Sequence, residues 1–205
     1  MAAIEEGKFT DEIVDVILKS KTGEIIFNKD EEPGKVNFDK ISSLRPVFDK
    51  NGVVTAANAS ILNDGAAALL IMSEEKAKEL GLTPLVEIVA QSSAAKAPIE
   101  FTTAPADAIQ KVLTKAKLTK DQIDLFEINE AFAVVSLAVN KILGLPNEKI
   151  NVNGGATAIG HPIGASGARI LTTLLYEMKR RKSEYGLATL CIGGGEASAL
   201  IVKKI

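Results

Sequence analysis

The sequence predicts an α/β fold in which a mixed β-sheet is covered by helices. Apolar residues make up 46% of the chain, aromatic residues only 4%, and Trp is absent. The core must therefore consist of Ala, Ile, Leu and Val, which is typical of sheets packed between helices. From residue 63 onward, short apolar runs alternate with amphipathic segments, which indicates strands alternating with helices. The last two apolar runs flank a glycine triplet, which adds an antiparallel hairpin.

Residues 1–62 are expected to form an appendage with little core of its own. Residues 1–7 resemble the middle of a helix that stops at a glycine, which suggests that a segment precedes them. Residues 13–19 and 24–27 read as two short strands joined by a turn. A charged loop over residues 28–35 follows.

Residues 63–205 are expected to form one regular layered domain. The expected strands are 66–72, 86–91, 123–128, 187–192 and 198–203, and the expected helices are 74–80, 105–116, 129–143 and 164–182. Ser73 and Asn129 are suitable N-cap residues, and Gly81 and Gly144 are suitable helix stops. The basic run 179–182 falls in the last turn of its helix, where the helix dipole favours positive charge.

Composition and charge exclude several functional classes. The 24 basic and 26 acidic residues give a net charge of -2, which does not indicate a nucleic-acid binder. No apolar run is long enough to span a bilayer, and no signal peptide is visible. A single cysteine excludes an internal disulfide and a cysteine-rich metal site. We therefore expect a cytoplasmic protein, with an organelle matrix as the other option, and no metal.

Asn129 and Glu130 lie where an expected strand turns into a helix. A structural interpretation is available, because Asn is a preferred N-cap and Glu in the first turn suits the helix dipole. A functional interpretation is also available, because ligands bind at the carboxyl ends of strands in open α/β sheets. Taken alone, this motif favours capping.

His161 is the only histidine and lies in a glycine-rich loop. The glycines around it are Gly154, Gly155, Gly160 and Gly164. A lone histidine is usually structural or exposed, but here the backbone can approach a ligand closely and Pro162 stiffens the next position. The two interpretations are about equally weighted. A phosphate-binding loop is disfavoured, because the Lys-Ser/Thr ending of a P-loop is absent.

Cys191 is the only cysteine and is followed by Ile192 and three glycines beginning at Gly193. A lone cysteine in an apolar strand is normally a small buried hydrophobe, and the glycines can simply form a turn. Alternatively, backbone N–H groups of the glycines can point at an oxyanion beside the thiol. Asn129, His161 and Cys191 together offer oxyanion binding, nucleophile activation and a second acid/base, so their joint occurrence favours a catalytic site.

Four ordered segments resemble signature blocks of the thiolases. They are residues 54–65, Asn-Glu-Ala-Phe from Asn129, Gly-His-Pro-Ile-Gly from Gly160, and Cys-Ile-Gly-Gly-Gly from Cys191. The resemblance covers essentially the whole chain and is especially close to biosynthetic acetyl-CoA acetyltransferases over residues 151–195. It implies a thiolase C-terminal domain over residues 63–205, preceded over residues 1–62 by part of a CoA-contacting loop domain.

The resemblance implies the C-terminal half of an acetyl-CoA C-acetyltransferase, without the domain that carries the nucleophilic cysteine. The expected reaction is the reversible Claisen condensation of two acetyl-CoA to acetoacetyl-CoA, with coenzyme A as substrate and product and no cofactor. Expected partners are acyl-CoA, an N-terminal thiolase half or homologous subunit, and further copies in a homo-oligomer, but neither nucleic acid nor membrane. The alternative is a non-catalytic fragment or subunit that binds CoA or completes a partner's active site. A ketosynthase is disfavoured, because such enzymes usually place a second histidine where this chain has Cys191.

The resemblance also implies a role for each catalytic candidate. His161 would deprotonate the thiol of the absent half, and Cys191 would remove an α-proton from the second acetyl-CoA. Asn129 would hold a water that, with a His161 N–H, stabilises the enolate oxygen. The N–H of Gly193 would form half of the oxyanion hole of the acyl-enzyme. Such donors are needed besides a base, because an α-proton next to a thioester is only weakly acidic.

Five further residues match CoA-binding positions of the thiolases. Ser60 would hydrogen-bond the pantetheine; Leu44, Phe48 and Ala56 would form an apolar wall; and Phe132 would line the inner pocket. The backbone around residues 56–59 also resembles a potassium-binding segment of one thiolase branch. Other branches share similar residues without the ion, so no metal is expected from it.

Overall fold

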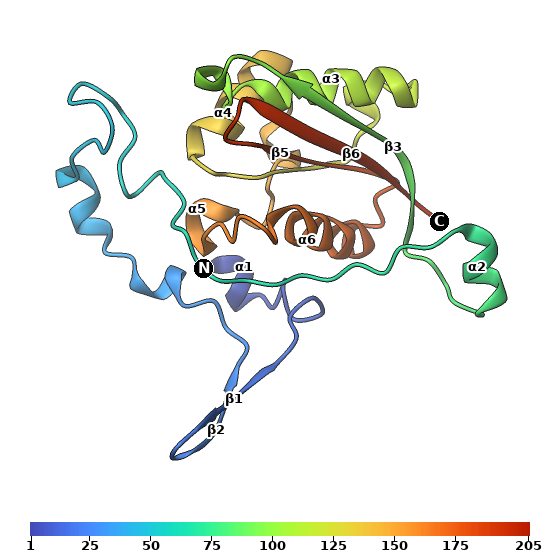
Figure 1. The fold of residues 1–205 in the computed structure, drawn as a ribbon, viewed down its shortest axis with the longest axis horizontal. Helices are drawn as coiled ribbons and strands as arrows, with labels where there is room; N and C mark the ends of the chain where they lie inside the picture. Colours follow the sequence, from blue (N-terminus) through green and yellow to red (C-terminus); the bar gives the residue numbers. More distant parts are fainter.

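The computed structural model describes residues 1–205 and confirms the α/β class (Figure 1). Four strands form one sheet in the order β3-β6-β5-β4. Their bounds are β3 (Val86–Ala95), β4 (Leu125–Ile128), β5 (Tyr185–Cys191) and β6 (Glu196–Lys204). β4 and β5 are parallel, whereas β5, β6 and β3 are antiparallel neighbours. The mixed sheet and its final hairpin are therefore as the sequence predicts.

Helices cover both faces of this sheet. Figure 1 shows α3 (Ala104–Ala116) on one side and α6 (Ser166–Arg181) on the other. α3 and α4 (Ala133–Leu143) contribute to a core of 19 buried residues, and α6 packs a second core of 6 on the opposite face. All four residues of β4 are buried, as expected for a strand covered on both faces.

The first 80 residues lie along one side of this body (Figure 1). They contain α1 (Ala2–Glu5), the hairpin of β1 (Val16–Ser20) and β2 (Gly23–Phe27), and α2 (Glu74–Glu79). Every residue of the hairpin is exposed. The Ser73 hydroxyl accepts a hydrogen bond from the Lys76 N–H, as a helix N-cap should. The short 3₁₀ turns of the chain are Glu32–Lys35, Phe38–Ser43, Pro98–Glu100, Lys120–Gln122 and Asn147–Lys149.

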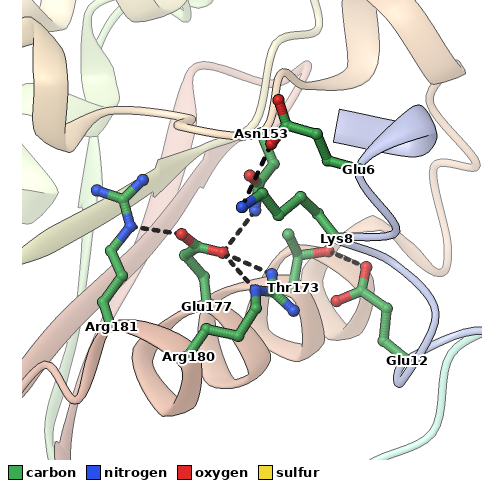
Figure 2. Close-up of polar contacts among 8 residues, drawn as sticks. All are labelled: Glu6, Lys8, Glu12, Asn153, Thr173, Glu177, Arg180 and Arg181. Atoms are coloured by element: carbon green, nitrogen blue, oxygen red, sulfur yellow. Dashed lines mark hydrogen bonds and ion pairs between the residues drawn. The ribbon is translucent and has the colours of Figure 1, made fainter. Parts of the chain in front are cut away.

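Polar contacts join the N-terminal segment to α6 (Figure 2). The Thr173 hydroxyl donates to Glu12 over 2.9 Å. On the same helix, the buried Glu177 carboxylate accepts hydrogen bonds from Arg180 and Arg181, and also from Asn153 in the loop before His161. These contacts fix the loop before His161 as well as the N-terminal segment against the helix. None of the helices combines the length and the apolar character that a membrane-spanning helix needs.

The prediction of a buried strand over residues 66–72 is wrong. The segment has no regular structure, and Leu70 and Ile71 are 81% and 68% exposed. An apolar run becomes a strand only when another backbone pairs with it, and neither edge strand of the sheet, β3 or β4, pairs with this segment.

Candidate active site

The site is built at the carboxyl end of β4, where Asn129 follows the last residue of the strand. Its N–H donates to the Thr189 carbonyl over 2.9 Å and so extends the ladder to β5. The capping interpretation of Asn129 is wrong, because α4 begins at Ala133 with Phe132 at the N-cap position. The Asn129 side chain is instead buried at 2% exposure, with Nδ2 3.4 Å from Nε2 of His161.

The loop that carries His161 is held by the segment of residues 61–63. The His161 N–H donates to the Ile61 carbonyl over 2.8 Å, and Asn63 Nδ2 donates to the Ile159 carbonyl over 2.9 Å. Between them, Gly160 has φ +90°, and a Cβ at that position would lie 2.3 Å from Asn63 Nδ2. Glycine is therefore required at Gly160 both by its backbone conformation and by this close approach.

The hydrogen bonds of the His161 ring define its tautomer. Its Nδ1 lies 2.5 Å from the Ser166 hydroxyl, which donates its own proton to the Pro162 carbonyl over 3.0 Å. With that proton on the Pro162 carbonyl, Ser166 accepts from an Nδ1–H, and the lone pair on Nε2 faces the Asn129 amide. Burial, together with the charge of Arg169, lowers the pKa of His161 below its usual 6.5. The ring is thus a neutral imidazole at neutral pH, with a basic Nε2.

Cys191 is brought to the same edge of the sheet. It ends β5, which runs parallel to β4, and parallel neighbours present their carboxyl ends at a common edge. The thiol is buried, and burial raises its pKa above the usual 9.0. No hydrogen bond joins Cys191 to His161 or Asn129, so the structure places it near them by topology only.

The turn after Cys191 leaves two backbone donors, the N–H groups of Gly193 and Gly194, without a partner in the chain. The Ile192 N–H donates to Glu196 and the Gly195 N–H donates to Ile192, which closes the turn. The N–H of Gly193, between them, makes no hydrogen bond within the chain. This is the arrangement that an oxyanion donor requires, because a donor already paired with the protein could not stabilise developing charge.

The structure brings together only some of the residues that were expected to contact CoA. The Phe132 ring meets the Phe48 ring edge-on at 5.8 Å, although Phe48 remains 76% exposed. The Ser60 hydroxyl donates to the Ala131 carbonyl over 2.8 Å, next to Phe132. Leu44 and Ala56 are exposed, and the structure does not bring them into this cluster.

Phe101 joins the aromatic cluster without having been expected from the sequence. Its ring meets that of Phe132 edge-on at 6.1 Å. Phe101 follows the 3₁₀ turn Pro98–Glu100 in the connection from β3 to α3, and no periodic pattern marks a residue in such a loop. Its role depends on a residue 31 positions later, which only the fold brings close.

Glu130 and Asn151 tie the histidine loop to β4. The Asn151 side chain accepts from the Ile128 N–H and donates to the Ile128 carbonyl, both over 2.8 Å. The Glu130 carboxylate accepts from Asn151 Nδ2 and from the Thr157 N–H, each over 3.2 Å, at the start of α5 (Ala156–Ile159). Glu130 therefore caps α5 rather than the first turn of α4. These bonds fix the distance between the strand end and the loop.

Three further polar groups lie around Asn129 and His161, of which Ser166 and Glu127 are buried and Arg169 is half-buried. Ser166 holds Nδ1 of the ring, and Arg169 Nη2 donates to Oδ1 of Asn129 over 3.2 Å. Glu127, 5% exposed within β4, has its pKa raised to about 8 by burial, against the opposing effect of the Arg169 charge. Glu127, Asn129 and Arg169 line a cavity of about 70 Å³. The only sequence signal for this group is that Glu127 interrupts an apolar strand.

Family models match most of the chain. Residues 1–75 match the thiolase N-terminal domain, and residues 82–204 match the thiolase C-terminal domain. The expectation that the chain represents only a C-terminal half is therefore wrong, because its first 75 residues match the N-terminal domain model. The boundary between residues 62 and 63 remains a prediction.

Individual relatives agree with the family match. The chain is 55% identical to an acetyl-CoA acetyltransferase of Syntrophomonas wolfei, over 99% of this chain and 52% of that protein. It is 53% identical to one of Cupriavidus necator, over 99% of this chain and 52% of that protein. The chain thus spans about half the length of the curated relatives that it matches.

Solved structures show the same fold. The Bacillus anthracis acetyl-CoA acetyltransferase superposes with a TM-score of 0.95 at 50% identity, covering 100% of this chain and 52% of that chain. Human mitochondrial 3-ketoacyl-CoA thiolase superposes with a TM-score of 0.91 at 40% identity, with the same coverage.

Proposed function

The chain belongs to the thiolase family, and from that premise we propose that it carries part of an acetyl-CoA C-acetyltransferase active site. The proposed reaction joins two acetyl-CoA into acetoacetyl-CoA and free coenzyme A, and also runs in reverse as thiolysis. The observation that carries the proposal is the pairing of His161 Nε2 with Asn129 Nδ2 at 3.4 Å, at the sheet edge where Cys191 also ends its strand.

In the first step, His161 Nε2 accepts a thiol proton, and the resulting thiolate attacks the carbonyl carbon of acetyl-CoA. The 205 residues contain one cysteine, Cys191, so a second thiol would come from outside this sequence. The Gly193 N–H donates to the carbonyl oxygen as negative charge develops there. The carbon–sulfur bond to coenzyme A then breaks, and Cys191 gives its proton to the departing CoA thiolate. The lowered pKa of His161 supports this step, since it keeps Nε2 unprotonated at neutral pH.

In the second step, the Cys191 thiolate removes an α-proton from the second acetyl-CoA. His161 now carries a proton on Nε2, and this N–H together with a water on Asn129 stabilises the enolate oxygen. The carbanion attacks the acyl thioester, and the enzyme thiolate leaves and regains its proton from His161. The raised pKa of Cys191 supports its role, because a weakly acidic thiol is a stronger base once ionised.

Coenzyme A is proposed to enter along Ser60, Phe48 and Phe132, as substrate and product rather than as a cofactor. Because the Ser60 hydroxyl already donates to Ala131, it would accept a hydrogen bond from a pantetheine amide. Leu44 and Ala56 would extend the apolar wall once the ligand covers them. The proposed protein partners are an N-terminal thiolase half or homologous subunit, and further copies of the same assembly.

The test is thiolysis of acetoacetyl-CoA by the purified chain, alone and mixed with the N-terminal half of the Cupriavidus necator relative. Activity only in the mixture is the expected result. The His161→Gln variant should abolish it, while the matched surface change Gln122→Ala should not. Activity of the chain alone would contradict the division of roles, because Cys191 would then act as the nucleophile.

A second candidate is a non-catalytic subunit that binds CoA or completes a partner's site. The observation in its favour is the burial of the only cysteine, whose raised pKa makes it a poor nucleophile by itself. Calorimetric binding of coenzyme A by a chain that remains inactive in every mixture would favour this candidate over the enzyme.

A further inference from the structure

Arg169 lies on α6, three residues after Ser166, and residues at this spacing share one face of a helix. Ser166 contacts Nδ1 of His161, and Arg169 donates to Oδ1 of Asn129, whose Nδ2 faces the other ring nitrogen. One face of α6 therefore contacts one ring nitrogen directly, through Ser166, and acts on the other ring nitrogen through Asn129. We propose that Arg169 is a positioning residue that orients the Asn129 amide and thereby keeps Nε2 of His161 a hydrogen-bond acceptor.

The two ends of an asparagine amide are nearly the same size, so its partners decide which end faces which neighbour. A guanidinium has only donors, so the atom facing Arg169 must be the carbonyl oxygen of Asn129. The NH₂ group then faces His161, and since it can only donate, Nε2 must accept. Ser166 does not fix the tautomer by itself, because its hydroxyl can either accept from an Nδ1–H or rotate to donate to Nδ1. The Asn129 end of the network therefore decides the tautomer, and Arg169 decides the orientation of the Asn129 amide.

The charge of Arg169 is itself held in place. The charges of carboxylates from three parts of the chain act on it without forming a salt bridge: Glu127 and Glu130 near β4, Glu12, and Asp30. Burial lowers the pKa of Arg169, while these carboxylates act to raise it. Its Nε is buried without a hydrogen-bond partner. The side chain of Arg169 makes one hydrogen bond, to Asn129, so that amide is the group on which it acts directly.

The inference deepens the proposed function, on which its catalytic meaning rests, but its first test does not depend on activity. His161 is the only histidine, so the ¹⁵N signals of imidazole nitrogens report this ring alone. We would record them for the full chain at about pH 9, where the ring is neutral in every variant. Wild type should show a protonated Nδ1 and an unprotonated Nε2. Arg169→Met should show a mixture of both tautomers.

Three comparisons make this result specific. Arg169→Lys should keep the wild-type pattern, because an ammonium also only donates. The matched change Lys179→Met, at an exposed position of the same helix, should leave it unchanged. In an Asn129→Ala background, Arg169→Met should cause no further change in the tautomer ratio of His161, because the amide through which Arg169 acts is absent.

Activity of the assembled mixture supplies the second readout. Arg169→Met should lower kcat about 10- to 100-fold with little change in KM for acetoacetyl-CoA, and Arg169→Lys should restore much of it. A folded Arg169→Met with the wild-type tautomer would overturn the proposal. If Arg169→Met does not fold, loss of the wild-type tautomer in a folded Arg169→Lys would overturn it instead. A tautomer change in a chain whose wild type is inactive in all mixtures would uphold the positioning and refute the proposed function.

Discussion

The carboxamide nitrogen of Asn129 and Nε2 of His161 lie 3.4 Å apart, although 32 residues separate them in the sequence. Asn129 comes from the end of β4, and His161 comes from a loop held by Ile61, Asn63 and hydrogen bonds to β4. The Asn129 amide faces the lone pair of His161 Nε2, so the fold sets a donor beside a base at the end of β4, as the proposed enolate chemistry would need.

Replacing Asn129 with Ala should lower kcat for thiolysis in the assembled mixture by about 10²- to 10³-fold, because one stabilising donor of the enolate is lost. Steady-state kinetics with acetoacetyl-CoA measure this. The matched change Asn140→Ala removes an exposed amide hydrogen bond to Asn147 and should have little effect. Equal rates for the two variants would exclude Asn129 from the chemistry.

Replacing Gly160 with Ala should destabilise the chain by about 1–3 kcal/mol, because the backbone is left-handed there and the new methyl group would meet Asn63. Urea unfolding of the two proteins gives this difference. Gly34→Ala is the control, since a Cβ at that exposed position meets nothing. A Gly160→Ala protein as stable as the control would show that the loop adopts another backbone path.

Replacing Glu127 with Gln should stabilise the chain at alkaline pH. The folded state keeps its proton up to about pH 8, whereas an ordinary glutamic acid loses it near 4.5. Wild type therefore loses stability relative to Glu127→Gln as pH rises between these values, and the difference vanishes below 4.5. The gain above pH 8 should be on the order of a few kcal/mol.

Denaturant unfolding across this pH range measures the effect of Glu127→Gln against the exposed control Glu148→Gln. A stability difference that does not grow with pH would mean that Glu127 ionises normally in the folded chain.

The acid limb of thiolysis by the mixture should have its midpoint below pH 6.5. Burial and the nearby Arg169 lower the pKa of His161, so Nε2 remains an available base under mildly acidic conditions. The lowered pKa also affects stability. As pH falls through 6.5, the unfolded chain takes up the His161 proton at a higher pH than the folded chain does, so the free energy of unfolding decreases. A pH–rate profile with a midpoint above 6.5 would conflict with this assignment of the base.

The sequence predicted the fold wherever local patterns determine structure. The four strands of the sheet and the helices α3, α4 and α6 follow from apolar periodicity and from helix stops, and so does the helix capped by Ser73. The short α5 was not expected, and α4 begins at Ala133 rather than at Asn129. The strand expected over residues 66–72 failed, because its apolar run resembles a buried strand while pairing depends on a distant backbone. Asn129 was misread as a helix cap for a related reason, since its partners are His161 and Arg169.

The residues of the candidate site also fall into two groups, those that the sequence reveals and those that only the fold reveals. Asn129, His161 and Cys191 stand in short motifs with glycines, and such motifs are visible in a sequence. Ser166 and Arg169 have ordinary positions on an amphipathic helix, and their importance comes from the side chains that the fold places beside them. Neither composition nor periodicity predicts those contacts.

The central claim is that Cys191 acts as the base and that the acyl group resides on another thiol. The most direct measurement is intact-mass analysis of each polypeptide after the mixture with the N-terminal half has been incubated with acetyl-CoA and quenched in acid. Wild-type and Cys191→Ser mixtures should both carry one acetyl group on the N-terminal half, while only the wild type goes on to form acetoacetyl-CoA. An acetyl group on Cys191 of this chain would contradict the claim.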